Sequence, residues 1–302
     1  MSAPRRSINS ARPATLGDWL AHAEKLYRRR RVALGQIATT VHDEALYLLL
    51  RTLGLPLDSK PAVLRRKLTA AEQERVAGVF RRRTAERVPA AYLTREAFLG
   101  GHRFYVDERV IIPRSYFVEL LPDLIPQWLP RGRPTRHAAD LCTGSGCLAV
   151  LLAHRFPQAK IDAIELSSEA LAVARFNVAQ HRLAQRIKLW RSDVFDTVPT
   201  VKYDLIIANP PYVPQRKLRR LPAEFRQEPA LALDGGRDGL DVIRKIFRQA
   251  RARLQPNGIV VLEVGGLRAA MDRAFPGLDL HWLHTEDGED CVCLVQAARL
   301  PK

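Results

Sequence analysis

Four consecutive residues, Asn209-Pro210-Pro211-Tyr212, have types that could do chemistry, and they end an apolar run. The run before them, residues 203–208, is rich in aliphatic and β-branched residues, which indicates a strand buried on both faces. Two successive prolines cannot donate to a β-ladder, so they end the strand. A residue before proline is held extended, and the Asn209 carboxamide therefore projects from the strand tip. Ligands bind at such tips in open α/β sheets, so we expect a functional site here rather than a simple turn.

A glycine turn forms a second candidate site. It lies in the run Asp140-Leu141-Cys142-Thr143-Gly144-Ser145-Gly146-Cys147. Glycines let a backbone approach a ligand closely, and the first turn of the following helix offers unpaired N–H groups. Glu165, followed by Leu166, ends the next predicted strand, where its carboxylate can accept from both hydroxyls of a ribose. This order of strand, glycine turn, helix and acidic strand end predicts a cofactor that carries a nucleoside.

Three carboxylates distinguish between nucleoside cofactors. Asp140 would repel the pyrophosphate of NAD, but it suits the ammonium group of a methionine moiety. Asp193 can accept from an adenine amino group while Val194 packs on the ring. With Glu165 they favour S-adenosylmethionine, whose sulfonium is cationic. The residues that we expect to bind this cofactor are Asp140, Cys142, Thr143, Gly144, Gly146, Glu165, Leu166, Asp193, Val194 and Asn209.

The pattern of elements that must position these residues changes along the chain. Strands and helices alternate from residue 137 onward, which predicts an α/β, mostly parallel, doubly wound sheet. We expect strands at 138–142, 160–165, 187–190, 203–208, 258–264, 280–283 and 291–296, and helices at 147–156, 168–181 and 240–254. A glycine-rich segment, residues 228–240, is expected to be a loop packed beside the site.

The N-terminal third reads as a small helical bundle after a basic arm, residues 1–15. Apolar residues from Trp19 to Tyr27 share one helix face, and Thr69 to Glu72 form a capping box. Alternating apolar residues around Asp107-Glu108-Arg109 predict a short hairpin that links two domains. We therefore expect three segments, a helical domain at 1–95, a hairpin linker at 96–113 and a cofactor-binding domain at 114–302.

Composition limits the remaining possibilities. The 302 residues carry a net charge of +16, which indicates a polyanionic partner such as RNA or reflects an arginine-rich coding bias. Arginine runs at 28–31 and 81–83 are either solvated helix faces or a phosphate-binding surface. The sequence has no membrane-length apolar stretch and no signal peptide, so we expect a cytoplasmic protein without a membrane partner. The four cysteines lack metal-binding spacing, and we expect reduced thiols and no metal.

Motifs spread over residues 16–296 resemble the protein-glutamine methyltransferases, class I enzymes that use S-adenosylmethionine. Besides the two sites above, the resemblance rests on Ser192-Asp193, His42-Asp43-Glu44-Ala45, Ala91-Tyr92-Leu93-Thr94, Phe104-Tyr105-Val106-Asp107-Glu108-Arg109-Val110 and Ile112-Pro113-Arg114-Ser115. It is sharpest for the bacterial branch that modifies large-subunit ribosomal protein three, because the release-factor branch usually has glycine where Cys142 stands. The resemblance implies a Rossmann-like seven-stranded sheet and a ribosomal protein as the partner. The basic arm and the cysteine-rich run 289–293 depart from the family pattern.

Methylation of an amide places clear demands on the strand tip. An amide nitrogen is a poor nucleophile because its lone pair is delocalised, so both N–H groups must be held by fixed acceptors. The Asn209 side-chain oxygen and the Pro210 carbonyl are suitable acceptors, and Tyr212 can stack on the flat amide. Transfer is then an in-line displacement promoted by alignment, and it requires no general base. We expect Asn209, Pro210, Pro211 and Tyr212 to be the catalytic residues.

Other functions remain open at this point. A release-factor glutamine methyltransferase fits the same motifs, and a DNA adenine methyltransferase would offer a flipped base instead of the amide. A non-catalytic RNA-binding assembly factor is disfavoured by the intact Asp140, Glu165, Asp193 and Asn209. Because ribosomal proteins are themselves basic, we hypothesise that the substrate is bound to ribosomal RNA in an assembly intermediate, with the arginine clusters contacting that RNA.

Overall fold

The computed structural model describes residues 13–300. The chain divides into two compact units, with the boundary between Thr94 and Arg95. Most of the expected basic arm lies outside the described residues, and Thr15 is already the N-cap of the first helix. Among the described residues, no helix combines the length and apolar character that a membrane span requires.

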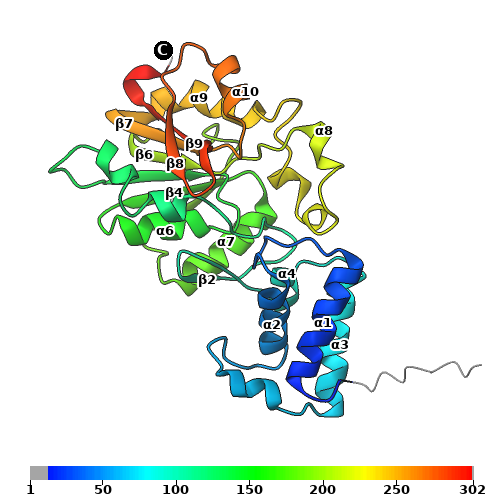
Figure 1. Ribbon diagram of the computed structural model, residues 1–302. Helices are drawn as coiled ribbons and strands as arrows, with labels where there is room; N and C mark the ends of the chain where they lie inside the picture. The colour runs from blue at the N-terminus through cyan, green and yellow to red at the C-terminus, as the bar shows by residue number, and fades with distance from the viewer. Residues whose placement is uncertain (1–12, 301–302) are drawn as a thin grey trace, which may run out of the picture. The chain divides into compact units, whose positions relative to one another are not determined.

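The N-terminal unit is a bundle of helices (Figure 1). It consists of α1 (Leu16–Arg30), α2 (Val41–Thr52), α3 (Ala70–Thr84) and α4 (Ala90–Thr94), with a short 3-10 helix at Pro61–Arg65. The capping box predicted at Thr69 is confirmed, since the Thr69 hydroxyl accepts from the Glu72 N–H and the Glu72 carboxylate accepts from the Thr69 N–H. The predicted apolar face of α1 is buried at Trp19 and Tyr27. Local capping and one apolar stripe per helix account for this unit.

A buried ion pair sits inside the N-terminal unit. The Arg83 Nε donates to Glu44 Oε1 at 2.7 Å, and its Nη2 donates to the Ala33 carbonyl at 2.8 Å. Both side chains of the ion pair are shielded from solvent, and the guanidinium also lies over the Tyr27 ring. The prediction that residues 81–83 form one exposed arginine run is therefore wrong for Arg83, which ties α2 to α3.

The C-terminal unit begins with a hairpin, β1 (Ala97–Leu99) and β2 (His102–Phe104). Its turn is Gly100-Gly101, where both glycines have positive φ. A turn does occur at residues 107–109, where the Val110 N–H donates to the Asp107 carbonyl and the Asp107 carboxylate accepts two hydrogen bonds from the Arg109 side chain. The predicted hairpin around this turn is wrong, because the paired strands lie earlier in the chain, on either side of Gly100-Gly101. Two short helical segments follow, α5 (Phe117–Leu120) and a 3-10 helix at Ile125–Trp128.

Seven strands form the sheet of this unit, in the order β5-β4-β3-β6-β7-β9-β8. The strands are β3 (His137–Leu141), β4 (Lys160–Glu165), β5 (Ile187–Arg191), β6 (Tyr203–Ala208), β7 (Leu254–Glu263), β8 (His281–Thr285) and β9 (Gly288–Gln296). The first five pair in parallel and β9 pairs antiparallel with β7 and β8. The predicted doubly wound, mostly parallel, seven-stranded sheet is confirmed. β7 begins four residues earlier than the predicted 258 because Leu254 pairs with Tyr203.

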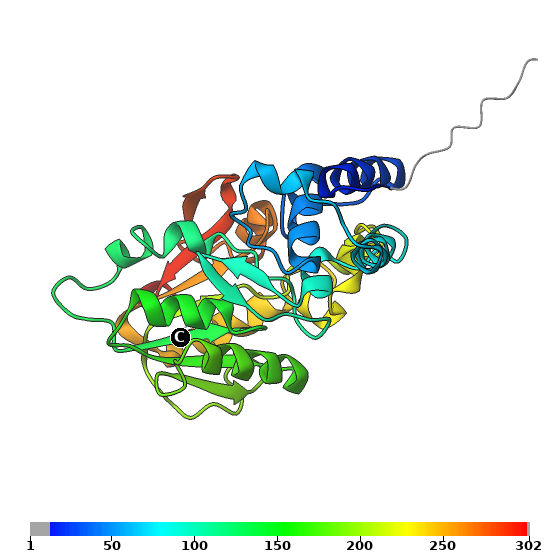
Figure 2. The same ribbon diagram turned by 90° about the horizontal axis from the view of Figure 1, so that it is seen from below.

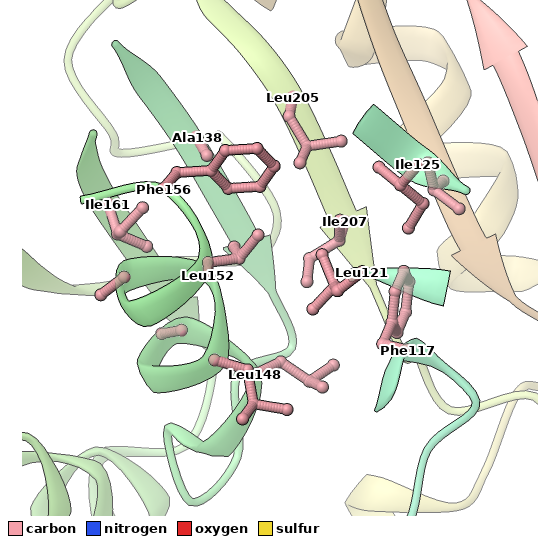
Figure 3. Packing of buried hydrophobic residues seen from close by; sticks show 14 of the residues in the cluster. Phe117, Leu121, Ile125, Ala138, Leu148, Leu152, Phe156, Ile161, Leu205 and Ile207 are labelled. Carbon is pink, nitrogen blue, oxygen red and sulfur yellow. The ribbon is translucent and has the colours of Figure 1, made fainter. Parts of the chain in front are cut away.

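Helices cover both faces of the sheet (Figures 1 and 2). The long helices are α6 (Cys147–Arg155), α7 (Ser168–Gln180) and α9 (Asp241–Arg253). The shorter segments are α8 (Gln215–Leu218), α10 (Arg268–Ala274) and the 3-10 turns Phe225–Gln227, Ala230–Ala232 and Ala297–Arg299. Alternate residues of β6 enter different cores, and Figure 3 shows Leu205 and Ile207 on the face covered by α5 and α6. Ile206 packs on the other face, with α9. Burial on both faces explains why the strand sequence has no polar alternation.

Loss of Glu44 should destabilise the N-terminal unit strongly. Glu44→Gln leaves the Arg83 guanidinium buried without its counter-charge, and we expect the opening free energy of α2 and α3 to fall by about 3 kcal/mol or more. Hydrogen exchange of the full chain, read by mass spectrometry over these helices, measures this. Glu86→Gln is the control, because its ion pair with Arg82 is about half exposed and contributes less than about 1 kcal/mol. Equal effects of the two substitutions would contradict the expected role.

Candidate active site

Sheet register places four site residues in one row. Leu141 of β3 lies opposite Ala208 of β6, and the neighbouring strands β4 and β7 are in the same register. The four strands run parallel, so their carboxyl ends share one edge of the sheet. The residues that occupy this edge are Glu165, Cys142, Asn209 and Glu263.

A cavity of about 260 Å³ opens beside this edge. This volume is several times that of a water molecule, so the cavity suits an organic ligand. Of the predicted residues, those that line it are Cys142, Glu165, Leu166, Asp193, Val194, Asn209 and Pro211. The cavity lining does not include Asp140, Thr143, Gly144, Gly146, Pro210 or Tyr212. Sequence reasoning missed the contribution of residues 108–111, which form part of the lining.

Asp140 is fully buried beneath the glycine turn. Its Oδ2 accepts from the Thr143 hydroxyl, while its Oδ1 has no hydrogen-bond partner among residues 13–300. Burial raises the pKa of Asp140 to about 7. A buried carboxylate oxygen without a donor is costly, and a cationic ligand group would satisfy it. The ammonium of S-adenosylmethionine is such a group.

Glu165 holds the glycine turn through both carboxylate oxygens. Oε2 accepts from the Gly144 N–H at 2.9 Å, and Oε1 accepts from the Ser167 N–H at 3.0 Å. Burial raises the pKa of this carboxyl group. Each oxygen has a second lone-pair direction, so both can still accept from ribose hydroxyls.

Backbone strain marks two residues of the cavity wall. Cys142 and Val194 have φ of 58° and 54°, a left-handed conformation that is costly for side chains, above all β-branched ones. Both residues line the cavity, which is where such strain is retained for function. Burial raises the pKa of the Cys142 thiol, so it stays protonated and is no nucleophile.

Asp193 is half exposed at the rim of the cavity. Its Oδ2 forms an ion pair with Lys245 Nζ at 2.7 Å, and Lys245 also pairs with Asp196. The neighbouring Val194 is buried and offers an apolar surface to the cavity. The ion pair orients the Asp193 carboxylate and leaves acceptor positions for a ligand amino group.

Glu263 fixes the orientation of the Asn209 carboxamide, and sequence reasoning missed it. Asn209 Nδ2 donates to Glu263 Oε1 at 3.0 Å and to the Arg114 carbonyl at 3.4 Å. With the amino end so engaged, Asn209 Oδ1 is left as an acceptor. The other Glu263 oxygen accepts from the Ser115 hydroxyl at 2.5 Å. Burial raises the pKa of Glu263 to about 7. The sequence did contain one signal for this role, because Glu263 is an acidic residue close to the end of the predicted strand 258–264.

Tyr212 rests against a glycine that follows β7. A Cβ added to Gly265 would lie 2.2 Å from Tyr212 Cε2, closer than any real contact, and Gly265 has φ of +51°. The ring therefore needs glycine at this position. Burial raises the pKa of Tyr212, so the ring is neutral at physiological pH.

The loop after the strand tip is held to the tip by Arg114. Arg114 Nη1 donates to Glu228 Oε1 at 2.9 Å, and the Arg114 carbonyl accepts from Asn209. Glu228 is buried, and Pro229 and Leu231 of the same loop line the cavity. The expected packing of this loop beside the site is therefore observed.

Asn177 of α7 joins the glycine turn to the segment after the hairpin. Its Oδ1 accepts from the Tyr105 N–H at 2.8 Å, and its Nδ2 donates to the carbonyls of Tyr105 and Ser145 at 3.0 and 2.9 Å. Asn177 is fully buried. Beyond Tyr105, the salt bridge between Arg109 and Asp107 shapes the stretch that enters the cavity wall.

Comparison with known proteins agrees with the fold. A family model described as "Methyltransferase small domain" matches residues 120–279. A solved structure titled as the hMettl16 catalytic domain in complex with MAT2A 3′UTR hairpin 6 is similar in fold, with a TM-score of 0.50, 16% identity, and coverage of 76% of this chain and 81% of that chain. The fold and the family model define a class I methyltransferase that uses S-adenosylmethionine as its methyl donor.

Curated relatives specify the family. A ribosomal protein uL3 glutamine methyltransferase of Burkholderia pseudomallei is 46% identical over 294 residues, which cover 95% of this chain and 96% of that protein. The protein of the same name from Bordetella pertussis is 44% identical over 286 residues, which cover 95% and 96%. The chain belongs to the ribosomal protein uL3 glutamine methyltransferase family. The resemblance found in the sequence is thereby confirmed.

The pH dependence of methyl transfer should follow Glu263. With saturating cofactor and acceptor, we expect kcat to rise with pH through about 7, because only the ionised carboxylate holds Asn209 firmly. Glu263→Gln should lower kcat by about 10-fold or more and flatten this rise. Ser115→Ala should move the rise to higher pH, since it removes a donor to the ionised form.

Cofactor affinity, measured by calorimetry, serves as the control for both variants and should change little. A pH profile of Glu263→Gln with the wild-type inflection would show that another group titrates.

Proposed function

We propose that this chain transfers a methyl group from S-adenosylmethionine to the side-chain amide nitrogen of a glutamine in ribosomal protein uL3. The observation that carries the proposal is the Asn209 carboxamide, whose amino end is held by Glu263 while its oxygen remains an acceptor beside the cavity. The Pro210 carbonyl also accepts no hydrogen bond from the described residues. Two fixed acceptors match the two N–H groups of a primary amide.

Cofactor binding follows from the walls of the cavity. When bound, S-adenosylmethionine supplies an electrophilic methyl group on a cationic sulfur. Asp140 lies beneath the glycine turn and not in the cavity wall, and its unpartnered Oδ1 attracts the ammonium group from there. Glu165, which lines the cavity, receives the ribose hydroxyls. Asp193 accepts from the adenine amino group, and Val194 and Leu166 pack on the ring. Cys142, Thr143, Gly144 and Gly146 shape the backbone turn around the methionine end.

The strand tip aligns the acceptor. Asn209 Oδ1 and the Pro210 carbonyl each accept one N–H of the glutamine, which turns the lone pair toward the methyl group. Tyr212, supported on Gly265, stacks on the amide plane and excludes water, and Pro211 keeps the tip rigid. Alignment of this kind supplies most of the rate of the displacement. The glutamine nitrogen needs no prior deprotonation, because it would release its extra proton to solvent only after the methyl group has been transferred.

The partner is proposed from the relatives and from charge. Relatives that cover 95% of this chain are named for uL3. A +16 enzyme would be repelled by a free basic protein, so we propose that the substrate is presented on ribosomal RNA in a cytoplasmic assembly intermediate.

Arginines of the N-terminal unit form a candidate RNA contact. Arg87 Nη2 donates to the Arg30 carbonyl at 2.6 Å, and Arg83 reaches the Ala33 carbonyl, so the ends of α1 and α3 lie together. The exposed arginines that gather there are Arg28, Arg29, Arg30, Arg31, Arg81 and Arg82.

Asn209→Ala tests the proposed chemistry. We expect cofactor affinity to stay within about 2-fold and transfer to fall by at least about 10²-fold, because the acceptor amide is no longer aligned. Labelled S-adenosylmethionine, ribosomal precursors and cell extract, followed by mass spectrometry of the labelled residue, measure transfer and identify the acceptor. Label on a release-factor glutamine or on adenine would replace uL3 as the substrate, and weak cofactor binding with normal turnover would overturn the role of Asn209.

Salt dependence tests the RNA contact. Arg29→Gln/Arg30→Gln/Arg81→Gln should weaken binding to ribosomal precursors and lower the slope of log affinity against log salt by up to about 3. The control is Arg131→Gln/Arg248→Gln/Arg273→Gln, which removes equal charge from exposed positions of the C-terminal unit. Faster, salt-insensitive methylation of free uL3, or equal effects of the two triple variants, would refute this mode of presentation.

A further inference from the structure

Three histidines that play no part in methyl transfer lie together in the C-terminal unit. They are His102 of β2, His154 near the end of α6 and His181 at the C-cap of α7. Each offers a ring nitrogen, and these three atoms lie within 4.8 Å of one another. None of the three lines the cofactor cavity. Three elements far apart in sequence therefore bring three potential ligands to one place.

The rings approach from two directions. His102 and His154 are stacked, with centroids 4.4 Å apart and planes 10° apart. His181 stands nearly perpendicular to both, at 75° to His102 and 78° to His154. Edge-to-face packing is itself common between aromatic rings, so the closeness of the three ring nitrogens, and not the ring angles, indicates a ligand set.

One positively charged side chain, Arg186, also acts on the His154 ring. Its charge opposes that of a bound ion.

His181 already has the second hydrogen bond typical of a metal ligand. Its Nε2 lies 2.9 Å from the Arg103 carbonyl. A carbonyl oxygen only accepts, so Nε2 carries the proton and Nδ1 carries the lone pair. Histidines that bind metals usually donate their other N–H to a carbonyl or carboxylate, which fixes the ring.

Local electrostatics also favour a cation at this position. α6 ends at Arg155 and α7 ends at Gln180, so His154 and His181 lie at two helix C-termini. The unpaired carbonyls of a helix C-terminus carry partial negative charge. The two helix ends therefore offset part of the charge of a bound ion, despite Arg186 nearby.

We propose that His102, His154 and His181 bind a divalent transition metal ion of the zinc class, with a water molecule as the fourth ligand. Tetrahedral coordination at about 2.1 Å requires ligand atoms about 3.4 Å apart, so ligand atoms that lie up to 4.8 Å apart must approach by up to about 1.4 Å. His154 is exposed and free to make that movement. Imidazole ligands select zinc, cobalt, nickel or copper over magnesium or calcium. The ion would clamp the β1–β2 hairpin to α6 and α7, outside the site of methyl transfer.

The test uses the full chain without a histidine tag. Titration with Co²⁺ should give one equivalent of visible absorption of a tetrahedral site, and Zn²⁺ should displace it. His154→Ala should weaken Zn²⁺ binding by at least about 10-fold, because it removes an exposed ligand without disturbing the core. His284→Ala, which removes an exposed histidine of β8, should leave binding unchanged.

A second measurement distinguishes a metal ion that holds the β1–β2 hairpin in place from one that binds only at the surface. Zn²⁺ should slow hydrogen exchange in residues 97–104 of the wild-type chain and not of His154→Ala, and His102→Ala should behave as His154→Ala does. S-adenosylmethionine affinity reports that each variant is folded. The proposal is overturned if the wild-type chain binds no stoichiometric Zn²⁺, if binding survives His154→Ala, or if the hairpin gains no protection.

Discussion

The parallel pairing of β6 with β3 on one side and β7 on the other determines where every group at the strand tip can lie. Leu141, Ala208 and Leu262 are in register, so the residues that follow them share one edge of the sheet. A shift of one residue in β6 would move Asn209 away from both the glycine turn and Glu263. The apolar residues on both faces of β6 prevent such a shift, because it would exchange the two cores that they fill. The hydrophobic core thus controls the geometry of the polar site.

Three carboxyl groups lie at this edge or just beneath it, and they differ in how completely they are hydrogen-bonded. Glu165 is held by two backbone N–H groups, Glu263 by Asn209, Ser115 and Tyr116, and Asp140 has one oxygen without a donor. Burial raises the pKa of all three, so each ionised group is costly in the free protein. A cationic methyl donor would offset that cost at Asp140, whose Oδ1 has no donor among the described residues. Binding of the methyl donor should therefore also stabilise the folded protein.

Much of the fold and half of the cavity could be predicted from the sequence, because long apolar strands and a glycine turn are local signals. β4 and β6 have the expected bounds, and Glu165 and Asn209 lie at the same edge. The hairpin was misplaced because residues 107–109 form a turn as expected, but the pairing of Arg109 with Asp107 closes that turn without flanking strands. The role of Glu263 depends on Asn209, which is 54 residues away, and the burial of Arg83 depends on Glu44, which is 39 residues away. Such contacts have no local signature.

Asn177 has a consequence for how the two ligands communicate. One buried carboxamide is hydrogen-bonded to the carbonyl that precedes the Gly146 cap and to the backbone at Tyr105. A methyl donor that steadies the glycine turn must then also steady residues 105–111, which complete the cavity wall. By thermodynamic reciprocity, an acceptor protein that orders those residues tightens the hold on the donor by the same factor. A methyl donor and an acceptor protein that both order this segment would therefore each bind more tightly when the other is present.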